Sequence, residues 1–300
     1  MFVKPLQKPR VLTLYELLHK RNALTQKEMR QYFQLKKGFE GEKRIYELIN
    51  SLSGDYLALH DLLLSSNNQT FQVDFLLVID GTLHLFEVKN YHGEFYFDSD
   101  RFFRVPQTEI SNPVIQLIRT ESLLRQLLQQ YGFQNSIQST VIFTNPEFTL
   151  FYAPRKKEFL LPTQLNRFFQ NFTGQTPIGA AHKDLTETLQ SLHISESPYQ
   201  LLPSYDFKQI KKGIPCHQCH TLTTFVEKQS CICQKCDYKE PLEKAIIRNI
   251  QEHQLLFPDQ KMTTTRIREW CKIVESNWRI RRVLNKCFAQ KGKRKWAYYE

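Results

Sequence analysis

The chain has 300 residues, of which 41% are apolar and 24% are charged, an ordinary balance for a globular protein. This balance excludes wholesale disorder, and no apolar run approaches the ~18 residues that a membrane-spanning helix needs. Two prolines and an arginine interrupt the first ten residues, so they do not resemble a signal peptide. The sequence therefore predicts a cytoplasmic protein with two domains and room for a small third.

Positive charge is concentrated in the last third of the chain. Residues 207–300 contain 20 Lys and Arg against 9 Asp and Glu, and this difference equals the net charge of the whole chain, +11. A local basic excess is typical of nucleic-acid binding, because neutralised phosphates release their counterions. A solvated basic tail or a membrane-surface patch is the alternative. We favour a nucleic-acid partner and no membrane.

The N-terminal third predicts helices followed by strands. Helical spacing of apolar residues predicts a helix over 11–35, and Gly38 and Gly41 then break the pattern and open a second helix, which ends before Gly54. Strands are expected over 56–63, 71–79, 82–89, 94–97 and 101–105.

The middle of the chain returns to helical patterns. Asn112 is expected to cap a helix that has Pro113 at its first position and reaches about Tyr131, and a strand over 139–144 follows. This order predicts an α/β layer with one mixed sheet. Short helices near 163–171 and 183–192 and a linker over 198–203 complete this part.

Asp80-Gly81 joins the two strongest strands and predicts a hairpin. With a two-residue turn, Asp74 should lie directly opposite Glu87, with Cβ atoms ~4.5–5.5 Å apart. Lys89 follows Glu87 by two residues and therefore shares its face. Strict alternation places this face with Leu76, Val78, Leu83 and Leu85, and the opposite face with Phe71, Val73, Phe75, Leu77, Ile79, Phe86 and Val88.

These three polar residues fit metal-assisted hydrolysis of a phosphodiester. Two facing carboxylates repel one another, and burial increases the cost. Mg²⁺ or Mn²⁺ would relieve the repulsion between Asp74 and Glu87, and Lys89 could stabilise charge that develops on a phosphate. The alternative is structural, with both carboxylates paired to Lys89 and to backbone donors.

Two further polar residues lie on core-facing helix positions. Glu42 precedes Ile45 by three residues, so its carboxylate should point towards the sheet. Gln116 occupies the first turn of the helix that begins at Pro113. The alternatives are a favourable charge near a helix N-terminus for Glu42 and a satisfied, partly buried amide for Gln116.

These segments together resemble the nuclease-related domain (NERD) family of the PD-(D/E)xK nuclease superfamily. The resemblance covers about residues 36–145 and depends on four segments in order: Gly38–Glu42, Gln72–Val78, Phe86–Asn90 and Asn112–Gln116. It implies that Asp74 and Glu87 are metal ligands, Lys89 the catalytic lysine, Glu42 a helix-borne acid and Gln116 an ancillary active-site residue. Val73 stands where the superfamily's name has proline.

Five of the seven cysteines lie between residues 216 and 236. Two C-x-x-C pairs, Cys216/Cys219 and Cys233/Cys236, can supply four thiolates to one structural Zn²⁺, and a short strand between them predicts a zinc ribbon. Cys231 is a possible alternative to Cys233, and a Cys₃His site with a neighbouring histidine is a minor one. Reduced free cysteines would leave this small segment without enough core to fold.

The basic C-terminal segment predicts three helices and a hairpin, typical of a winged helix-turn-helix. The expected nucleic-acid-binding residues lie on the third helix and the wing: Arg279, Arg281, Arg282, Lys286, Lys291, Lys293, Arg294 and Lys295. The alternative is a small helical bundle with a solvated basic face.

The sequence thus predicts a restriction-endonuclease-like α/β fold with a mixed sheet flanked by helices. The expected parts are an N-terminal helical extension (1–35), a nuclease-like domain with an extension (36–206), a zinc ribbon (207–240) and a basic winged-helix-like module (241–300). The hypothesis is a Mg²⁺-dependent nuclease that acts on DNA. A non-catalytic nucleic-acid-binding or regulatory protein and an RNA-directed enzyme are the alternatives.

Overall fold

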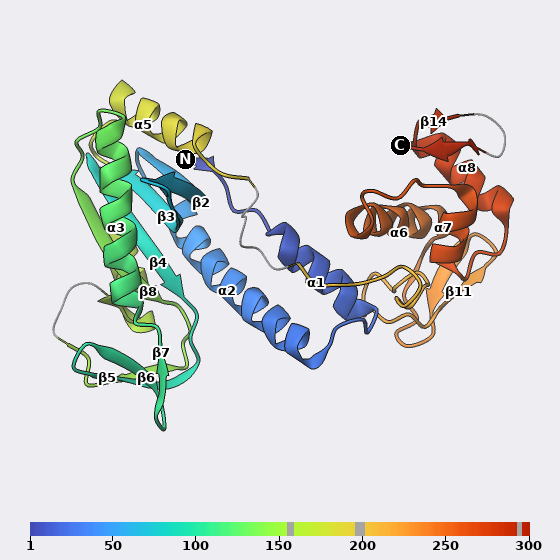
Figure 1. Cartoon of the computed structure of the whole chain (residues 1–300), viewed down its shortest axis with the longest axis horizontal. Coiled ribbons are helices and arrows are strands. Elements are labelled where there is room, and N and C mark those ends of the chain that lie inside the picture. The colour runs from blue at the N-terminus through green and yellow to red at the C-terminus, as the bar shows by residue number, and fades with distance from the viewer. Residues whose placement is uncertain (155–158, 196–201, 293–295) are drawn as a thin grey trace. The chain divides into compact units, whose positions relative to one another are not determined.

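The computed structural model describes residues 1–154, 159–195, 202–292 and 296–300 (Figure 1). The chain folds into two units. Unit 1 comprises Met1–Lys8 and Gln34–Gln200, and unit 2 comprises Pro9–Phe33 and Leu201–Glu300. Within the described part of the chain, no helix has the length and apolar character needed to cross a membrane.

Unit 1 is built on a six-stranded mixed sheet, as the sequence predicts. Its strand order is β1-β2-β3-β4-β8-β10. Strands β2, β3 and β4 pair antiparallel, whereas β1, β8 and β10 each join their neighbours in parallel. The strands are β1 (Phe2–Lys4), β2 (Tyr56–Ser66), β3 (Gln69–Ile79), β4 (Thr82–Lys89), β8 (Ile137–Phe143) and β10 (Phe159–Leu160).

A smaller four-stranded sheet follows the end of β4. Its order is β7-β6-β5-β9, and its buried side is aromatic, with Phe95 and Phe102 stacked at 5.6 Å. The strands are β5 (Gly93–Asp98), β6 (Arg101–Arg104), β7 (Thr108–Ile110) and β9 (Phe148–Phe151). The sequence predicted β5 and β6 but not the short strands at either edge.

Helices cover both faces of the large sheet. Helices α3 (Pro113–Gln130) and α5 (Ala180–Ser191) share a core with one face, while α2 (Gln26–Asn50) and α4 (Leu165–Gln170) share a core with the other. A 3₁₀ turn, η1 (Pro162–Gln164), precedes α4. The predicted cap of α3 is present, since the Asn112 side chain accepts a hydrogen bond from the Val114 N–H. Apolar stripes on both sides explain why the strands are apolar on both faces.

The expected helix break at Gly38 and Gly41 is wrong. Helix α2 runs through both glycines, and the break lies earlier, between α1 (Arg10–Lys20) and α2. Thr25 and Glu28 form a reciprocal capping box that begins α2. Gly41 has a packing role instead, because a Cβ there would lie 2.7 Å from the Cβ of Asn90 and 2.8 Å from Thr144 Oγ1.

The strands of the central hairpin also change sides along their length. Phe75 packs in the core beneath α2, as alternation predicts, but Val73 packs in the opposite core with Leu62. Asp61 of β2 has a left-handed φ of 52°, and neither Asp61 nor Asp74 appears in the otherwise regular β2–β3 register. The local twist at Asp61 and Asp74 reverses the alternation, so the single-period prediction fails for Phe71 and Val73.

Unit 2 contains a small three-stranded sheet, four helices and a terminal hairpin among its described residues. The sheet has the order β11 (Thr224–Glu227), β12 (Ser230–Cys233) and β13 (Lys239–Pro241). Helices α6 (Leu242–Leu256), α7 (Thr264–Cys271) and α8 (Asn277–Cys287) share one core, and β14 (Gln290–Lys291) pairs with β15 (Tyr298–Tyr299). Side chains of Thr263 and Ser276 cap α7 and α8.

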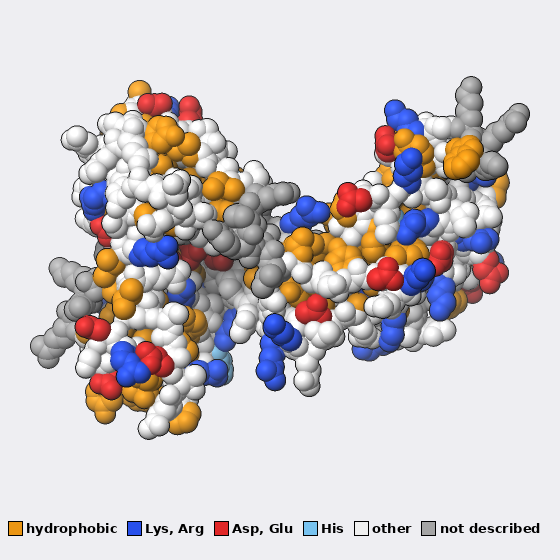
Figure 2. Space-filling view, viewed as in Figure 1, with side chains coloured by type: hydrophobic (Ala, Val, Ile, Leu, Met, Phe, Trp, Pro, Cys, Tyr) orange, Lys and Arg blue, Asp and Glu red, His pale blue; other side chains and the backbone are white. Residues whose placement is uncertain are grey.

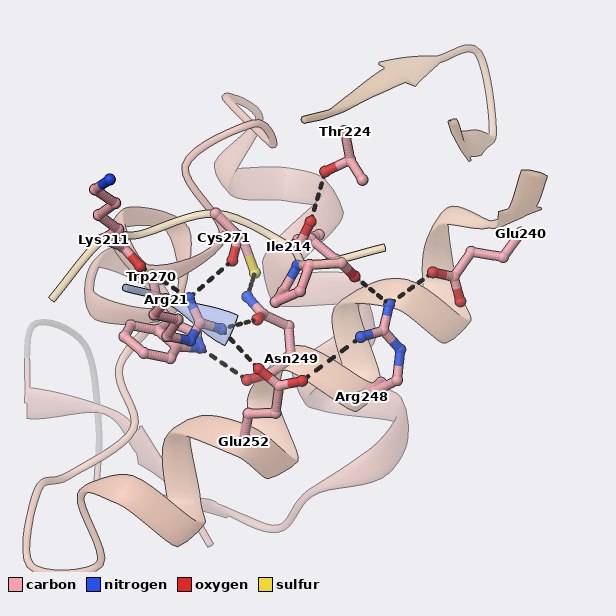
Figure 3. A network of polar contacts seen from close by, with 12 residues as sticks. Arg21, Lys211, Ile214, Thr224, Glu240, Arg248, Asn249, Glu252, Trp270 and Cys271 are labelled. Atoms are coloured by element: carbon pink, nitrogen blue, oxygen red, sulfur yellow. Dashed lines mark hydrogen bonds and ion pairs between the residues drawn. The ribbon is translucent and has the colours of Figure 1, made fainter. Parts of the chain in front are cut away.

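Arg21, which follows α1, makes buried contacts with residues of unit 2 that lie more than 200 positions later in the sequence (Figure 3). Its fully buried guanidinium donates to Glu252 Oε2 at 2.7 Å, to Asn249 Oδ1 at 2.8 Å and to the Lys211 carbonyl at 3.0 Å. It also lies 3.9 Å from the centre of the Trp270 ring. These contacts give the buried charge the partners that it requires, and they place α1 in the same unit as α6 and α7.

Candidate functional site

Lys89 is the centre of a polar cluster at the end of β4. Its Nζ atom lies 2.7 Å from Glu87 Oε1 and donates a second hydrogen bond to Gln116 Oε1 at 3.0 Å. Glu87 is 3% exposed, whereas Gln116 is exposed on the first turn of α3. Three side chains of the predicted site are therefore in direct contact. Two come from β4 and one from α3, which begins 24 residues after the last residue of β4.

Asp74 joins the cluster through the backbone of β4. Its Oδ2 atom accepts a hydrogen bond from the Val88 N–H at 2.8 Å. The β3–β4 register follows the predicted turn from Ile79↔Thr82 to Phe75↔Phe86, but it ends one pair before Asp74 and Glu87. The Asp74 carboxylate thus accepts a hydrogen bond from the β4 residue that lies between Glu87 and Lys89 in the sequence.

The carboxyl groups share a strongly unfavourable environment for negative charge. Burial raises the pKa of Asp74 well above its usual range, and the nearby charges of Glu87 and Glu42 raise it further. Burial also raises the pKa of Glu87, although the Lys89 ammonium opposes this shift. Burial lowers the pKa of Lys89, but the attraction of Glu87, its hydrogen bond and the nearby Tyr91 and Asp74 together raise the pKa above its usual value, so Lys89 is charged at neutral pH. This local excess of carboxylate suits a bound cation.

Glu42 points towards the sheet from α2, as predicted, and meets a buried histidine there. His60 Nε2 lies 2.9 Å from Glu42 Oε2, and the His60 side chain is 1% exposed and packs 4.8 Å from the Phe75 ring. Sequence reasoning missed His60. The signal was present, because His60 is a polar residue within the otherwise apolar start of β2.

The five predicted residues therefore occupy one end of the sheet but form separate contacts. Lys89 binds Glu87 and Gln116, Asp74 binds the β4 backbone, and Glu42 binds His60. Among the described residues, the carboxylates do not form a close group of three ligand atoms. The phenol of Tyr91, which sequence reasoning also missed, adjoins this cluster, and burial raises its pKa.

Four cysteines form a close group of metal-ligand atoms. The Sγ atoms of Cys216, Cys219, Cys233 and Cys236 all lie within 4.8 Å of one another. Two of these separations join the pairs crosswise, 3.7 Å for Cys216 to Cys236 and 3.5 Å for Cys219 to Cys233. Four thiolates at these separations fit a structural Zn²⁺ and leave no open position for catalysis.

Cys231 lies outside this group. It is 2% exposed in the core of unit 2, where burial raises its pKa to about 11. By contrast, hydrogen bonds from Thr221 and from the backbone N–H groups of Lys235 and Cys236 outweigh burial and lower the pKa of Cys233 to about 6. The two cysteines are two residues apart on β12, so strand alternation alone does not distinguish them. Cys233 is the last residue of β12 and joins the other three cysteines, whereas Cys231 packs in the core.

The basic residues predicted to bind nucleic acid lie on α8 and β14. Arg281, Arg282 and Lys291 are exposed, whereas Arg279 is half-buried. Lys286 is also exposed, but its Nζ atom lies 2.5 Å from Glu243 Oε1 and part of its charge is therefore balanced within unit 2. Lys293, Arg294 and Lys295 lie outside the described residues. In Figure 2, Lys and Arg side chains are spread over the visible surface of unit 2.

Two family models match the chain. Residues 37–144 match the nuclease-related domain (NERD), which confirms the resemblance drawn from the sequence over 36–145. Residues 142–290 match a domain of unknown function, DUF6671. Neither the search of curated proteins nor the search of solved structures found a match.

Proposed function

We propose that the protein is a metal-dependent nuclease that hydrolyses phosphodiester bonds in DNA. The observation that carries this proposal is the contact of Lys89 with Glu87 and Gln116 beside the half-buried Asp74. The cluster lies wholly within residues 37–144, the segment that matches the nuclease-related domain. The match supports a nuclease-like fold, and Asp74, Glu87, Lys89 and Gln116 supply that fold with the carboxylates, the ammonium group and the amide that the proposed reaction uses.

The carboxylates of Asp74 and Glu87 have the chemistry to hold Mg²⁺ or Mn²⁺. Both are oxygen donors with raised pKa values, so a cation would stabilise their ionised forms. When bound, a divalent cation supplies Lewis acidity and lowers the pKa of a water ligand. Glu42 adds negative charge on the α2 side of the same cluster, since it raises the pKa of both carboxyl groups.

Lys89 would stabilise the charge that develops on the scissile phosphate. Its ammonium is positive at neutral pH and is held by two acceptors, so it is already oriented before substrate binds. Preorganised charge in a partly desolvated site stabilises a transition state more than mobile charge in water does. Gln116 positions the ammonium from α3 without adding a competing negative charge.

His60 would position Glu42. The imidazole is buried and packs on Phe75, so its 2.9 Å contact fixes the direction of the Glu42 carboxylate. A carboxylate held in one orientation loses less conformational entropy when it meets a cation or water. His60 is therefore a positioning residue in this account and does not touch the reacting atoms.

Unit 2 would bind substrate. We propose that the four cysteines hold one structural Zn²⁺, because the small sheet β11–β13 has little core of its own. Helices α6, α7 and α8 followed by the β14–β15 hairpin have the order of a winged helix, and Met262 bridges to Tyr299 beside them. On this reading Arg279, Arg281, Arg282 and Lys291 contact phosphates. The cytoplasmic location remains a prediction.

A non-catalytic nucleic-acid-binding protein is the second candidate. The separate contacts of Glu42 and Asp74 favour it, because the carboxylates are not already gathered around one point. The intact Asp74, Glu87 and Lys89 favour the nuclease, since a site without a catalytic role has no need of mutually repelling carboxyl groups with raised pKa values.

The test is cleavage of labelled single- and double-stranded DNA and RNA by the purified chain with added Mg²⁺ or Mn²⁺ or with neither. The proposal predicts that DNA is cut only when a divalent cation is added. Salt-sensitive binding without cutting under any of these conditions would contradict it and favour the binding protein. Cutting of RNA alone would show that RNA, and not DNA, is the substrate.

A further inference from the structure

The Trp278 side chain is exposed and is not part of the core of unit 2. It is the second residue of α8 and is 67% exposed, although tryptophan is usually well buried. At ~100° per residue, Trp278 lies on the opposite side of α8 from Ile280, Val283 and Leu284, which pack in the core of unit 2. The indole therefore points directly away from its own core.

The indole is nevertheless held in place by a cation. The guanidinium of Arg282, one helical turn further along, lies 5.5 Å from the centre of the Trp278 ring. This cation–π contact reduces the freedom of both side chains before any partner arrives. The pair forms a preorganised surface of one flat aromatic face and one positive group.

The surroundings of this pair favour a polyanion. Helix α8 carries Arg279, Arg281 and Arg282 and contains no acidic residue, while its Lys286 is paired with Glu243 of α6. The exposed Lys291 follows on β14. A protein partner of ordinary composition or an apolar ligand would not require this charge, whereas phosphates would be attracted by it.

We infer that Trp278 stacks on an unpaired base, and that unit 2 therefore favours nucleic acid with single-stranded segments. The indole offers a single N–H donor, so it reads base edges poorly, but its face can stack on any base. Stacking on a base face requires that the base be exposed, which a continuous duplex does not permit. Arg282 would then contact the adjacent phosphate. This inference rests on the proposed binding role of unit 2 but not on catalysis.

The experiment measures binding with the full-length chain carrying Lys89→Ala, so that cleavage does not consume the probe. A further Trp296→Phe change leaves Trp278 as the exposed tryptophan, because Trp270 is fully buried. The probes are a 20-nucleotide oligothymidylate and a blunt 20-base-pair duplex of two complementary strands, which has no unpaired loop. The inference predicts that the oligothymidylate quenches tryptophan fluorescence and that the duplex binds more weakly and quenches less.

The decisive variants change Trp278 alone. Base stacking is worth about 1–3 kcal/mol, so Trp278→Leu should weaken binding of the oligothymidylate by about 5- to 150-fold. Trp278→Phe should retain most of the affinity, and binding of the duplex should change less than twofold. Because the side chain faces solvent, neither variant should affect folding.

An unchanged affinity for oligothymidylate in Trp278→Leu would overturn the inference. An equal loss for single strand and duplex would also overturn it, because it would assign Trp278 a general contact in place of stacking on an unpaired base. Absence of nuclease activity in the native chain would leave both results interpretable, since no step in this test uses cleavage.

Discussion

The Val88 N–H donates a hydrogen bond to Asp74 Oδ2 at 2.8 Å, at the point where the β3–β4 pairing ends. A side chain thus replaces a backbone acceptor in the ladder. This replacement holds the Asp74 carboxylate against β4, between Glu87 and Lys89, and keeps it there despite the raised pKa that burial imposes.

Asp74→Asn should abolish metal-dependent cleavage and raise the stability of unit 1. A raised pKa in the folded state means that stability is lost as pH rises from the unfolded pKa, ~4, through the folded value. The uncharged amide avoids this loss, so the melting temperature at pH 7 without divalent cations should rise by about 2–4 °C. Calorimetry is the suitable measurement, because all three tryptophans lie in unit 2.

Added Mg²⁺ provides the control for this prediction. It should raise the melting temperature of the wild type, because a ligand that binds only the folded state stabilises it. The effect should be absent in Asp74→Asn. A variant less stable than the wild type at pH 7, or equal Mg²⁺ stabilisation of both proteins, would show that Asp74 is not a repelled metal ligand.

Gln116→Ala should slow cleavage without changing the fold. The lost hydrogen bond to Lys89 is worth about 1 kcal/mol, which corresponds to a five- to tenfold fall in kcat. Gln129→Ala is the matched control, since Gln129 is also exposed on α3 but lies at its far end. Equal rates for the two variants would remove Gln116 from the site.

Cys233→Ala and Cys231→Ala should have opposite effects on zinc. We expect one Zn²⁺ per wild-type chain by elemental analysis, loss of the metal in Cys233→Ala, and retention in Cys231→Ala. The reason is that Cys233 faces the other three cysteines while Cys231 faces the core. Cys231→Ala should cost about 1 kcal/mol of stability through lost packing. Zinc loss in Cys231→Ala with retention in Cys233→Ala would contradict the assignment.

Arg21→Met should destabilise unit 2 strongly. It leaves Glu252 Oε2 without the Arg21 guanidinium that lies 2.7 Å away, although Arg248 remains 3.6 Å from Glu252 Oε1. We expect a loss of about 3 kcal/mol in the free energy of unfolding, measured by denaturant titration with tryptophan fluorescence. Arg30→Met, at an exposed position, should change it by less than about 0.5 kcal/mol. Similar values for both would show that the buried network is not stabilising.

Local rules explain much of what the sequence predicted. The Asp80-Gly81 turn fixed the β3–β4 register from Ile79 to Phe75, and alternation then placed Glu87 and Lys89 on one face. The position of Gln116 followed from the cap at Asn112 and the proline after it. Turns, caps and periodicity act over a few residues, so a single sequence contains them.

The failures depend on longer-range or exceptional geometry. Gly41 appeared to be a helix breaker, but its role is to allow α2 to approach Asn90 and Thr144, which are far away in sequence. The reversal of alternation at Asp74 depends on the left-handed backbone of Asp61 in the neighbouring strand. Arg21 was indistinguishable from a surface helix residue, because its partner Glu252 lies 231 residues away.

The proposed mechanism requires Lys89 to act on substrate from a metal-dependent site. The most direct measurement compares single-turnover cleavage of labelled DNA by the wild type, Lys89→Ala and Lys43→Ala with Mg²⁺. Lys43 is the control because it is exposed on α2, one residue from Glu42, and pairs only loosely with Glu47 at 3.8 Å. We predict that Lys89→Ala lowers the rate at least 100-fold, about 3 kcal/mol of transition-state stabilisation, while Lys43→Ala cuts like the wild type. Equal rates for Lys89→Ala and the wild type would contradict it.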